Sequence, residues 1–241
     1  MAPRPDPGRD RADRTDPGRT LVIGCGALAR ELMAVVRASR LDAVDVRCLP
    51  ASLHNHPERI PAAVDAAIGA DAGRHGRIFV AYGDCGTGGA LDRVLAAHGA
   101  ERLPGAHCYQ FYAGGAAFDA LAAEEPGTFY LTDFLARSFD ALVIRGLGLD
   151  RHPELLSVYF SGYQRLVLLS QTGDPRVLEL ARAAADRLGL AFEHRHTGYG
   201  ELGSTVAGLG TPGVPRRAPA TSRAAPPPAA VPASAASAGA A

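Results

Sequence analysis

The sequence predicts an α/β protein with a mainly parallel sheet and helices on both faces. Short apolar runs alternate along the chain with segments whose apolar residues recur at helical spacing. Glycines, prolines and polar residues separate these segments. Residues 20–206 form one stretch of globular composition, which is long enough for a single domain with a sizeable core.

The two ends of the chain differ in composition from this central part. Residues 1–19 are rich in proline, arginine, aspartate and glycine, and residues 207–241 are rich in proline and alanine. Neither end can bury enough apolar surface to offset the entropy lost on ordering. We therefore expect a disordered N-terminal tail over residues 1–19, an α/β domain over residues 20–206, and a disordered C-terminal tail over residues 207–241.

The predicted strands are short apolar runs that end at glycine, proline or polar residues. They span residues 21–24, 44–49, 77–82, 129–132, 165–170 and 191–194. The predicted helices span residues 27–38, 57–68, 90–98, 134–143 and 175–188. Residues 21–26 and 79–86 both place Cys-Gly between a strand and a helix, which suggests repeated strand-loop-helix units. In such sheets ligands bind at loops beyond the carboxyl ends of the strands.

Charge and composition exclude several classes of function. The 25 basic and 25 acidic residues give a formal net charge of zero, so no strong field would attract nucleic acid or an anionic membrane. The chain contains no lysine, which excludes a Schiff-base lysine and a phosphate-loop lysine. The apolar runs are too short to span a bilayer, and the N-terminus has no apolar signal region. We expect a cytoplasmic protein whose cysteines are thiols or metal ligands.

Three of the four cysteines are candidates for chemistry. Cys25 and Cys85 each lie beside glycine between a strand and a helix, where a helix N-terminus would stabilise the thiolate. Cys108 follows His107 in a predicted loop. Together these residues could ligate zinc, with sulfurs about 4 Å apart, or an iron–sulfur cluster with wider spacing. Cys48 lies inside a predicted strand, where we expect it to pack as a small apolar side chain.

Other polar residues near these cysteines extend the candidate site. His54 follows a strand and, like His107, could be a fourth ligand or a proton-transfer group, although loop histidines often have no such role. Asp84, beside Cys85, could orient a ligand or accept a proton. Gly86 and Gly88 are candidate cofactor-binding residues, yet their loop lacks the order of a nucleotide-binding motif and could be only a tight turn.

Two further polar stretches have a simpler interpretation. Thr132 or Asp133 precedes a predicted helix, and we expect a helix cap there rather than a catalytic group. Asp150 and His152 precede Pro153, which suits the first turn of a helix.

Several blocks of this sequence resemble one known family. They are Ile23-Gly-Cys-Gly, Leu49-Pro-Ala-Ser-Leu-His-Asn, Tyr82-Gly-Asp-Cys-Gly-Thr-Gly-Gly, His107-Cys-Tyr, Glu125-Pro-Gly-Thr-Phe-Tyr-Leu-Thr-Asp and Leu147-Gly-Leu-Asp-Arg-His-Pro-Glu. They are similar to the signature blocks of domain-of-unknown-function family 1638 over most of residues 20–199. The resemblance implies no secure activity. It suggests a link to corrinoid-dependent methyl transfer, with a corrinoid protein as a possible partner beside a small-molecule substrate.

Three hypotheses follow from these observations. The first is a metalloprotein, and we expect an enzyme, with zinc or an iron–sulfur cluster bound by Cys25, Cys85, Cys108 and His107 or His54. The second is a non-enzymatic carrier or accessory protein for a metal or a corrinoid. The third is a metal-free thiol catalyst that uses Cys85. The sequence identifies neither the substrate nor the metal.

Overall fold

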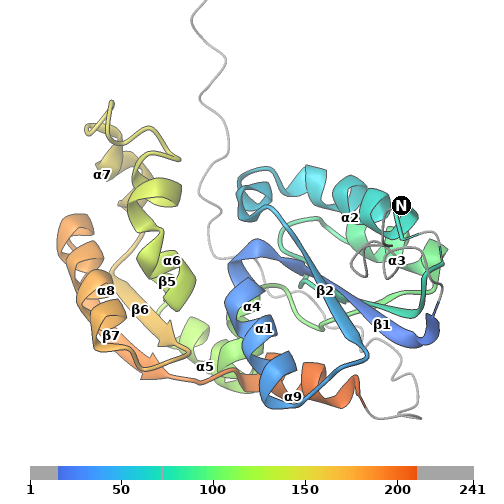
Figure 1. Ribbon diagram of the computed structural model, residues 1–241. Coiled ribbons are helices and arrows are strands. Elements are labelled where there is room, and N and C mark those ends of the chain that lie inside the picture. The colour runs from blue at the N-terminus through green and yellow to red at the C-terminus, as the bar shows by residue number, and fades with distance from the viewer. Residues whose placement is uncertain (1–15, 72, 211–241) are drawn as a thin grey trace, which may run out of the picture.

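A computed structural model describes residues 16–71 and 73–210, which form two parallel sheets surrounded by helices (Figure 1). This arrangement confirms the predicted α/β class with parallel strands. It differs from the expectation of one sheet, because the strands divide into two sheets that no hydrogen-bonded strand pair joins within the described residues. Most of the two predicted tails, residues 1–15 and 211–241, lies outside the described residues.

The first sheet contains the strands of the N-terminal half in the order β2-β1-β3-β4. They are β1 (Asp16–Cys25), β2 (Val44–Leu49), β3 (His75–Ala81) and β4 (Glu101–Arg102). β1 pairs on both sides, and its central residues Leu21, Val22 and Ile23 are buried. A strand covered on both faces needs such a continuous apolar run, which explains its sequence.

The second sheet contains the strands of the C-terminal half in the order β5-β6-β7. They are β5 (Thr128–Thr132), β6 (Arg165–Ser170) and β7 (Ala191–His196). The central strand β6 is again the most apolar, and its residues Leu166 to Leu169 are fully buried.

Helices and short helical turns connect these strands. The helices are α1 (Ala29–Ala38), α2 (Ile60–Gly69), α3 (Ala90–His98), α4 (Cys108–Ala113), α5 (Gly115–Glu124), α6 (Asp133–Arg137), α7 (Leu155–Phe160), α8 (Pro175–Leu188) and α9 (Gly200–Gly208). The turns are η1 (Gly26–Leu28), η2 (Ala51–Asn55), η3 (Pro57–Arg59) and the π-helical η4 (Asp140–Ile144). None of the described helices has the length and apolar character needed to cross a membrane.

The structure corrects several predicted boundaries. β1 begins at Asp16, so residues 16–19 belong to the sheet, and Arg19 forms two hydrogen bonds of 2.8 and 2.6 Å to Asp45. At the other end α9 continues to Gly208, beyond the predicted limit at residue 206. The helix predicted over residues 134–143 is divided into α6 and η4. β4, α4, α5 and α9 were not predicted.

Two contacts join the halves of the chain. α9 returns from the second sheet to the first, where Leu202 and Val206 are fully buried in the first core and the helix packs on α1 and α4. In the other direction, α6 contacts η1 and α4 contacts β6. Because η1 follows β1 and α6 follows β5, loops at the carboxyl ends of both sheets meet at this junction (Figure 1).

Candidate functional site

Cys25 lies at the carboxyl end of β1 and is buried. Its sulfur accepts a 3.3 Å hydrogen bond from the backbone N–H of Ala27, so it caps the turn that follows. Gly26 is required at the next position, because a Cβ there would lie 2.9 Å from the carbonyl oxygen of Leu49. The Nδ1 atom of His54 lies 3.5 Å from the Cys25 sulfur.

Cys85 lies in the turn between β3 and α3 with an unusual backbone conformation. Its φ angle is +49°, in the left-handed region that few residues other than glycine adopt. The backbone N–H of Cys85 donates a 2.8 Å hydrogen bond to the carbonyl oxygen of Ala106. A Cβ on Gly83 would approach the carbonyl oxygen of Gly105 to 3.0 Å, so this glycine allows the two loops to meet. A strained residue held by its surroundings is typical of functional sites.

Cys108 is the first residue of α4, whereas the sequence placed it in a loop. Burial raises its pKa well above the usual thiol value, and the nearby thiols of Cys85 and Cys25 raise it further. The thiol of Cys25 likewise raises the pKa of Cys85. Cys25 belongs to the first hydrophobic core and Cys85 and Cys108 pack against it, so the three thiols lie in one part of the fold.

The protonation state of these thiols differs from the prediction. Burial raises the pKa of Cys25 to about 11, although the Ala27 N–H acts in the opposite direction. Burial and the Cys25 thiol raise the pKa of Cys85 to about 12. We expected local backbone dipoles to favour thiolates. Desolvation outweighs them, so without a bound cation the thiols are protonated at neutral pH.

The tight arrangement expected for a single zinc ion is absent from the described part of the chain. Across residues 16–71 and 73–210, no three histidine, cysteine, aspartate or glutamate side chains are arranged to hold one metal ion.

His54 and His107 lie beside the thiols. The His54 ring stacks on Tyr82 with centroids 6.1 Å apart, and burial together with nearby His107 lowers the pKa of His54. Burial also lowers the pKa of His107, although Asp84 opposes this effect. Both imidazoles are therefore neutral at neutral pH and can accept a proton or a metal ion.

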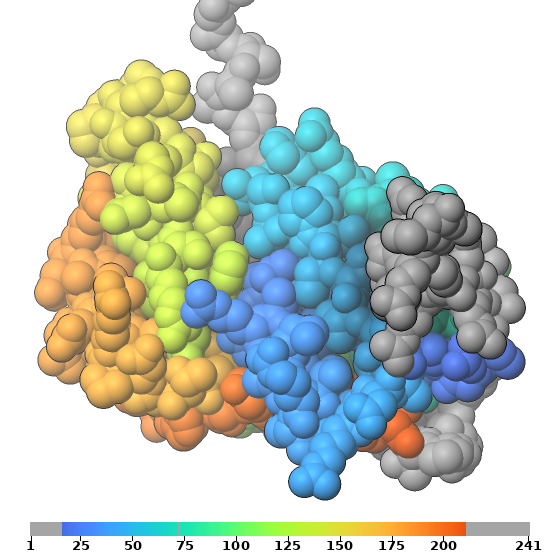
Figure 2. All heavy atoms as spheres, viewed as in Figure 1, coloured from blue at the N-terminus to red at the C-terminus, as the bar shows by residue number. Residues whose placement is uncertain are grey.

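His54 keeps an exposed surface, whereas His107 is half-buried. In Figure 2 the surface is hollowed between the yellow-green atoms of the second half and the blue and cyan atoms of the first half.

Asp84 closes its own loop. Its carboxylate accepts hydrogen bonds from the hydroxyl of Thr87 at 2.9 Å and from the backbone N–H groups of Gly88 and Gly89 at 3.1 and 2.8 Å. Burial opposes ionisation, but these hydrogen bonds lower the pKa of Asp84. The N–H groups that a phosphate would need at Gly88 and Gly89 are thus occupied. Gly86 has a positive φ and packs against Pro57. The loop has the geometry of a tight turn.

Cys48 and the remaining histidines of the sequence prediction are more exposed than these three thiols, although the Cys48 thiol still raises the pKa of Cys25. Cys48 is in β2 as expected, but its side chain is exposed rather than packed in the core. This strand is at the edge of its sheet, so it has fewer neighbours to cover it. His56 and His152 are exposed beside Glu58 and Glu154, at 3.5 and 3.3 Å.

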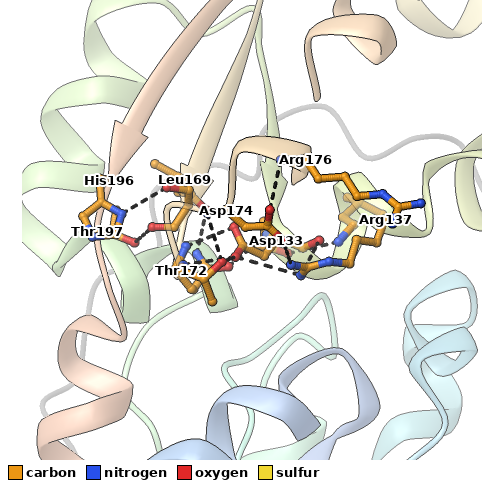
Figure 3. A network of polar contacts seen from close by, with 12 residues as sticks. Asp133, Arg137, Leu169, Thr172, Asp174, Arg176, His196 and Thr197 are labelled. Atoms are coloured by element: carbon orange, nitrogen blue, oxygen red, sulfur yellow. Dashed lines mark hydrogen bonds and ion pairs between the residues drawn. The ribbon is translucent and has the colours of Figure 1, made fainter. Parts of the chain in front are cut away.

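A polar network occupies the carboxyl edge of the second sheet (Figure 3). Asp133 is fully buried and accepts hydrogen bonds from the backbone N–H groups of Gln171 and Thr172, at 3.1 and 3.0 Å, and from the Thr172 hydroxyl. Arg137 donates a 3.0 Å hydrogen bond to Asp174. Thr132, rather than Asp133, caps α6 by accepting from the N–H of Leu135. Asp133 thus joins the start of α6 to the loop after β6.

Ser170 lies between two histidines at the same edge. Its hydroxyl oxygen is 2.9 Å from Nε2 of His194 and 3.2 Å from Nδ1 of His196. The residues of this group were not predicted as a site from the sequence. The sequence feature that could have revealed it is the pair His194 and His196, which are two residues apart in a strand and so lie on the same face of the sheet.

The sequence analysis also missed Glu31, Tyr82 and Tyr112 in the first half. Glu31 is buried in α1, and Tyr112 in α4 interacts with Glu31, Cys108, Asp133 and Cys25, each of which raises its pKa in addition to burial. The signal for Glu31 was its position on the apolar stripe of α1, where a carboxylate is unusual.

Comparison with known proteins identifies a family for most of the chain. Residues 48–206 match the family DUF1638, described as a protein of unknown function. Neither the curated proteins nor the solved structures contain a significant match. Cys85, Cys108 and Asp133 lie inside the matched residues, whereas Cys25 and Glu31 precede them. Since the match covers well over half of its length, this chain belongs to the DUF1638 family.

Proposed function

We propose that Cys25, Cys85 and Cys108 hold a thiolate-bound metal centre, and that an iron–sulfur cluster suits the site better than a single zinc ion. The observation that carries this proposal is the convergence of three thiols from separate segments of the chain on one region of the fold. The left-handed backbone of Cys85 is difficult to explain by packing alone.

We favour the cluster because the described residues hold no group of three or more histidine, cysteine, aspartate or glutamate side chains arranged for a single metal ion. Thiolates around one zinc ion lie about 4 Å apart, and no such set occurs among the described residues. Thiolates that bind separate irons of a cluster are more widely spaced. Three cysteine ligands would leave one iron of a four-iron cluster open to a ligand.

The high thiol pKa values argue against a metal-free thiol catalyst. With pKa values of about 11 for Cys25 and about 12 for Cys85, few thiolates form at neutral pH. A thiol catalyst needs the thiolate. A bound cation supplies the positive charge that deprotonates such buried thiols.

An enzyme fits the site better than a carrier. His54 Nδ1 lies 3.5 Å from the Cys25 sulfur and places a proton-transfer group next to a thiol, whereas simple metal storage needs only the ligands. Corrinoid-dependent methyl transfer remains the metabolic setting that the family resemblance suggests. Incubation of the metal-loaded protein with a methylated corrinoid and a thiol acceptor would test it through the spectrum of the demethylated corrinoid.

Anaerobic purification and reconstitution with iron and sulfide test the metal centre directly. We expect stoichiometric iron and sulfide, a broad visible absorption band and an EPR signal on reduction. Replacing Cys25, Cys85 or Cys108 individually by serine should remove the band. Their effects should not add, because each change breaks the same site.

Cys48→Ser is the matched control, since Cys48 is an exposed cysteine in the same sheet. It should keep the full cluster content. Binding of one equivalent of zinc without sulfide would refute the iron–sulfur cluster but would still support a metal centre at these cysteines. A protein that takes up neither after reconstitution would refute both.

A further inference from the structure

Two imidazoles and a hydroxyl converge at the carboxyl edge of the second sheet. Ser170 is the last residue of β6, and its hydroxyl oxygen lies 2.9 Å from Nε2 of His194 and 3.2 Å from Nδ1 of His196. The two histidines are two residues apart in β7, so both side chains leave the same face of that strand. In the parallel pairing of β6 with β7, Ser170 lies directly opposite His196. The strand register therefore brings three donor atoms to one place.

The two imidazoles are open to solvent, whereas the hydroxyl between them is held in the sheet. Only 2% of Ser170 is exposed, but both histidines are exposed. β7 is an edge strand of its sheet, so it has a strand neighbour on one side only. Gly173 follows in the next loop with a φ of +66°, and a Cβ there would touch the His196 ring at 3.6 Å. The glycine leaves this side of the ring uncovered by a side chain of its own.

The spacing of the three atoms is close to that of ligands around one metal ion. Ligand atoms of tetrahedral zinc lie about 2.0–2.1 Å from the metal and thus about 3.3–3.4 Å from one another. The two nitrogen–oxygen distances, 2.9 and 3.2 Å, are within a few tenths of an ångström of this spacing. Because the terminal torsion of a histidine side chain is broad, the exposed rings can turn enough to admit an ion. Imidazole is a preferred donor for zinc, copper and nickel.

The charged residues of β7 are arranged so that a cation can approach the histidines. Arg195 lies between them in sequence, so its side chain leaves the opposite face, where it contacts Glu193 at 2.5 Å. On the histidine face, Arg182 of α8 packs over the ring of Phe192, towards the start of the strand. The end of the strand thus presents imidazole nitrogens.

A serine beside a histidine is also the arrangement of a nucleophile and its base. A serine nucleophile needs access to its substrate and N–H donors for the oxyanion that forms. Ser170 is almost fully buried, and the N–H groups of the next two residues, Gln171 and Thr172, already donate to Asp133. Figure 3 shows Thr172 and Asp133 in this network beside His196. The surroundings of Ser170 therefore favour a bound cation over nucleophilic catalysis.

We propose that His194, His196 and Ser170 form a binding site for zinc or another borderline divalent cation. Nε2 of His194 and Nδ1 of His196 are the ligands, the Ser170 hydroxyl oxygen is the third donor, and water completes the coordination. Across residues 16–71 and 73–210, no third histidine, cysteine, aspartate or glutamate completes this set, so the ion is exchangeable and keeps an open position. This site shares no residue with the thiol centre and does not rest on it.

Zinc titration by calorimetry tests the site in the full chain carrying Cys25→Ser, which disables the proposed thiol centre. In this background His194→Ala and His196→Ala should each remove one zinc equivalent that the parent protein binds. Ser170→Ala removes one donor of three and should weaken binding about tenfold. His56→Ala is the matched control, because His56 is an exposed histidine beside Glu58, at 3.5 Å, and it should leave the titration unchanged.

Zinc that depends on Cys25 belongs to the thiol centre, whereas zinc that depends on His194 and His196 belongs to this site. The two proposals can therefore fail separately. A parent protein without saturable zinc binding would overturn the histidine site. So would His194→Ala and His196→Ala variants that bind zinc with the stoichiometry and affinity of the parent.

Nitrogen NMR of the same parent protein, labelled with ¹⁵N-histidine, tests the geometry without changing a ligand. Zinc should shift the signals of Nε2 of His194 and Nδ1 of His196, the two atoms that face Ser170. The single histidine variants assign these signals. Shifts confined to the other two ring nitrogens, or to neither residue, would overturn the proposal.

Discussion

Asp133→Ala tests whether the buried carboxylate holds the two loops of the second sheet together. The substitution removes the acceptor for the backbone N–H groups of Gln171 and Thr172, at 3.1 and 3.0 Å, and for the Thr172 hydroxyl. Gln171 is buried, and its own Oε1 accepts a 2.9 Å hydrogen bond from the backbone N–H of Asp133. The Asp133→Ala substitution would therefore break several connected hydrogen bonds rather than a single one.

The magnitude follows from the number of unsatisfied donors. A buried donor left without an acceptor costs about 1–3 kcal/mol. Thr172 is exposed and can reach water, so only the buried backbone N–H of Gln171 is counted. We expect Asp133→Ala to lower the free energy of unfolding by about 1–3 kcal/mol, a sizeable part of the total for a typical domain. Asp133→Asn keeps one acceptor oxygen and should cost less than alanine.

Urea denaturation followed by circular dichroism measures this effect as a shift of the midpoint with an unchanged slope. With a slope of about 1–3 kcal/mol per molar urea, the midpoint should fall by about 1 M. Asp186→Ala is the matched control, because Asp186 is exposed on α8 of the same half. If both variants stay within about 0.5 kcal/mol of wild type, the expected cost of the unsatisfied donors is refuted.

Three further predictions concern the first half. Cys85 has a left-handed backbone, so metal-free Cys85→Gly should be about 1 kcal/mol more stable than metal-free Cys85→Ala in urea denaturation; equal stabilities would show that the conformation is not strained. The raised pKa values of Cys25 and Cys85 stabilise the metal-free protein only while the thiols are protonated, so its stability should fall as the pH rises from 9 through about 11 and 12. Cys25→Ala should reduce this fall of stability with pH, measured by urea unfolding at several pH values. A fall identical to that of the wild type would contradict the raised pKa of Cys25. His75 lies 2.6 Å from buried Asp71 and 2.8 Å from Asp45, so His75→Ala should cost about 2–3 kcal/mol in thermal or urea unfolding, whereas exposed His56→Ala should cost almost nothing.

The agreement between sequence and structure is best where local signals act together. α8 spans residues 175–188 as predicted, because Asp174 caps its start, Pro175 occupies the first turn and Gly189 adopts the left-handed conformation at its end. β2 and β6 also match, since each apolar run has clear boundaries.

The unpredicted elements lack such signals. β4 has only two residues, and α5 begins at Gly115, directly after Gly114, where two glycines give no local signal for a helix. Strand patterns also do not say which strands pair, so the division into two sheets could not be derived from them. This division places the loop of residues 171–173 in the second half, where Gln171 and Thr172 bond to Asp133.

The candidate site was predictable only in part, because local sequence patterns do not specify which distant segments meet in the fold. The cysteines follow strands or precede helices, and parallel topology brings such loops together. Glu31 acquires its environment from Asp133, which is about a hundred residues away in the chain and in the other half. No local pattern encodes that contact.

The return of α9 to the first core has a consequence for biosynthesis. Leu202 and Val206 complete a hydrophobic core whose other residues come mainly from the first half of the chain. A ribosome must therefore synthesise the whole second sheet before the residues that close the first core emerge. Contacts between such distant segments form slowly, because the intervening chain must first be brought together. During translation the N-terminal strands, with all four cysteines of the chain, therefore lack the cover of α9 until the second half has been made.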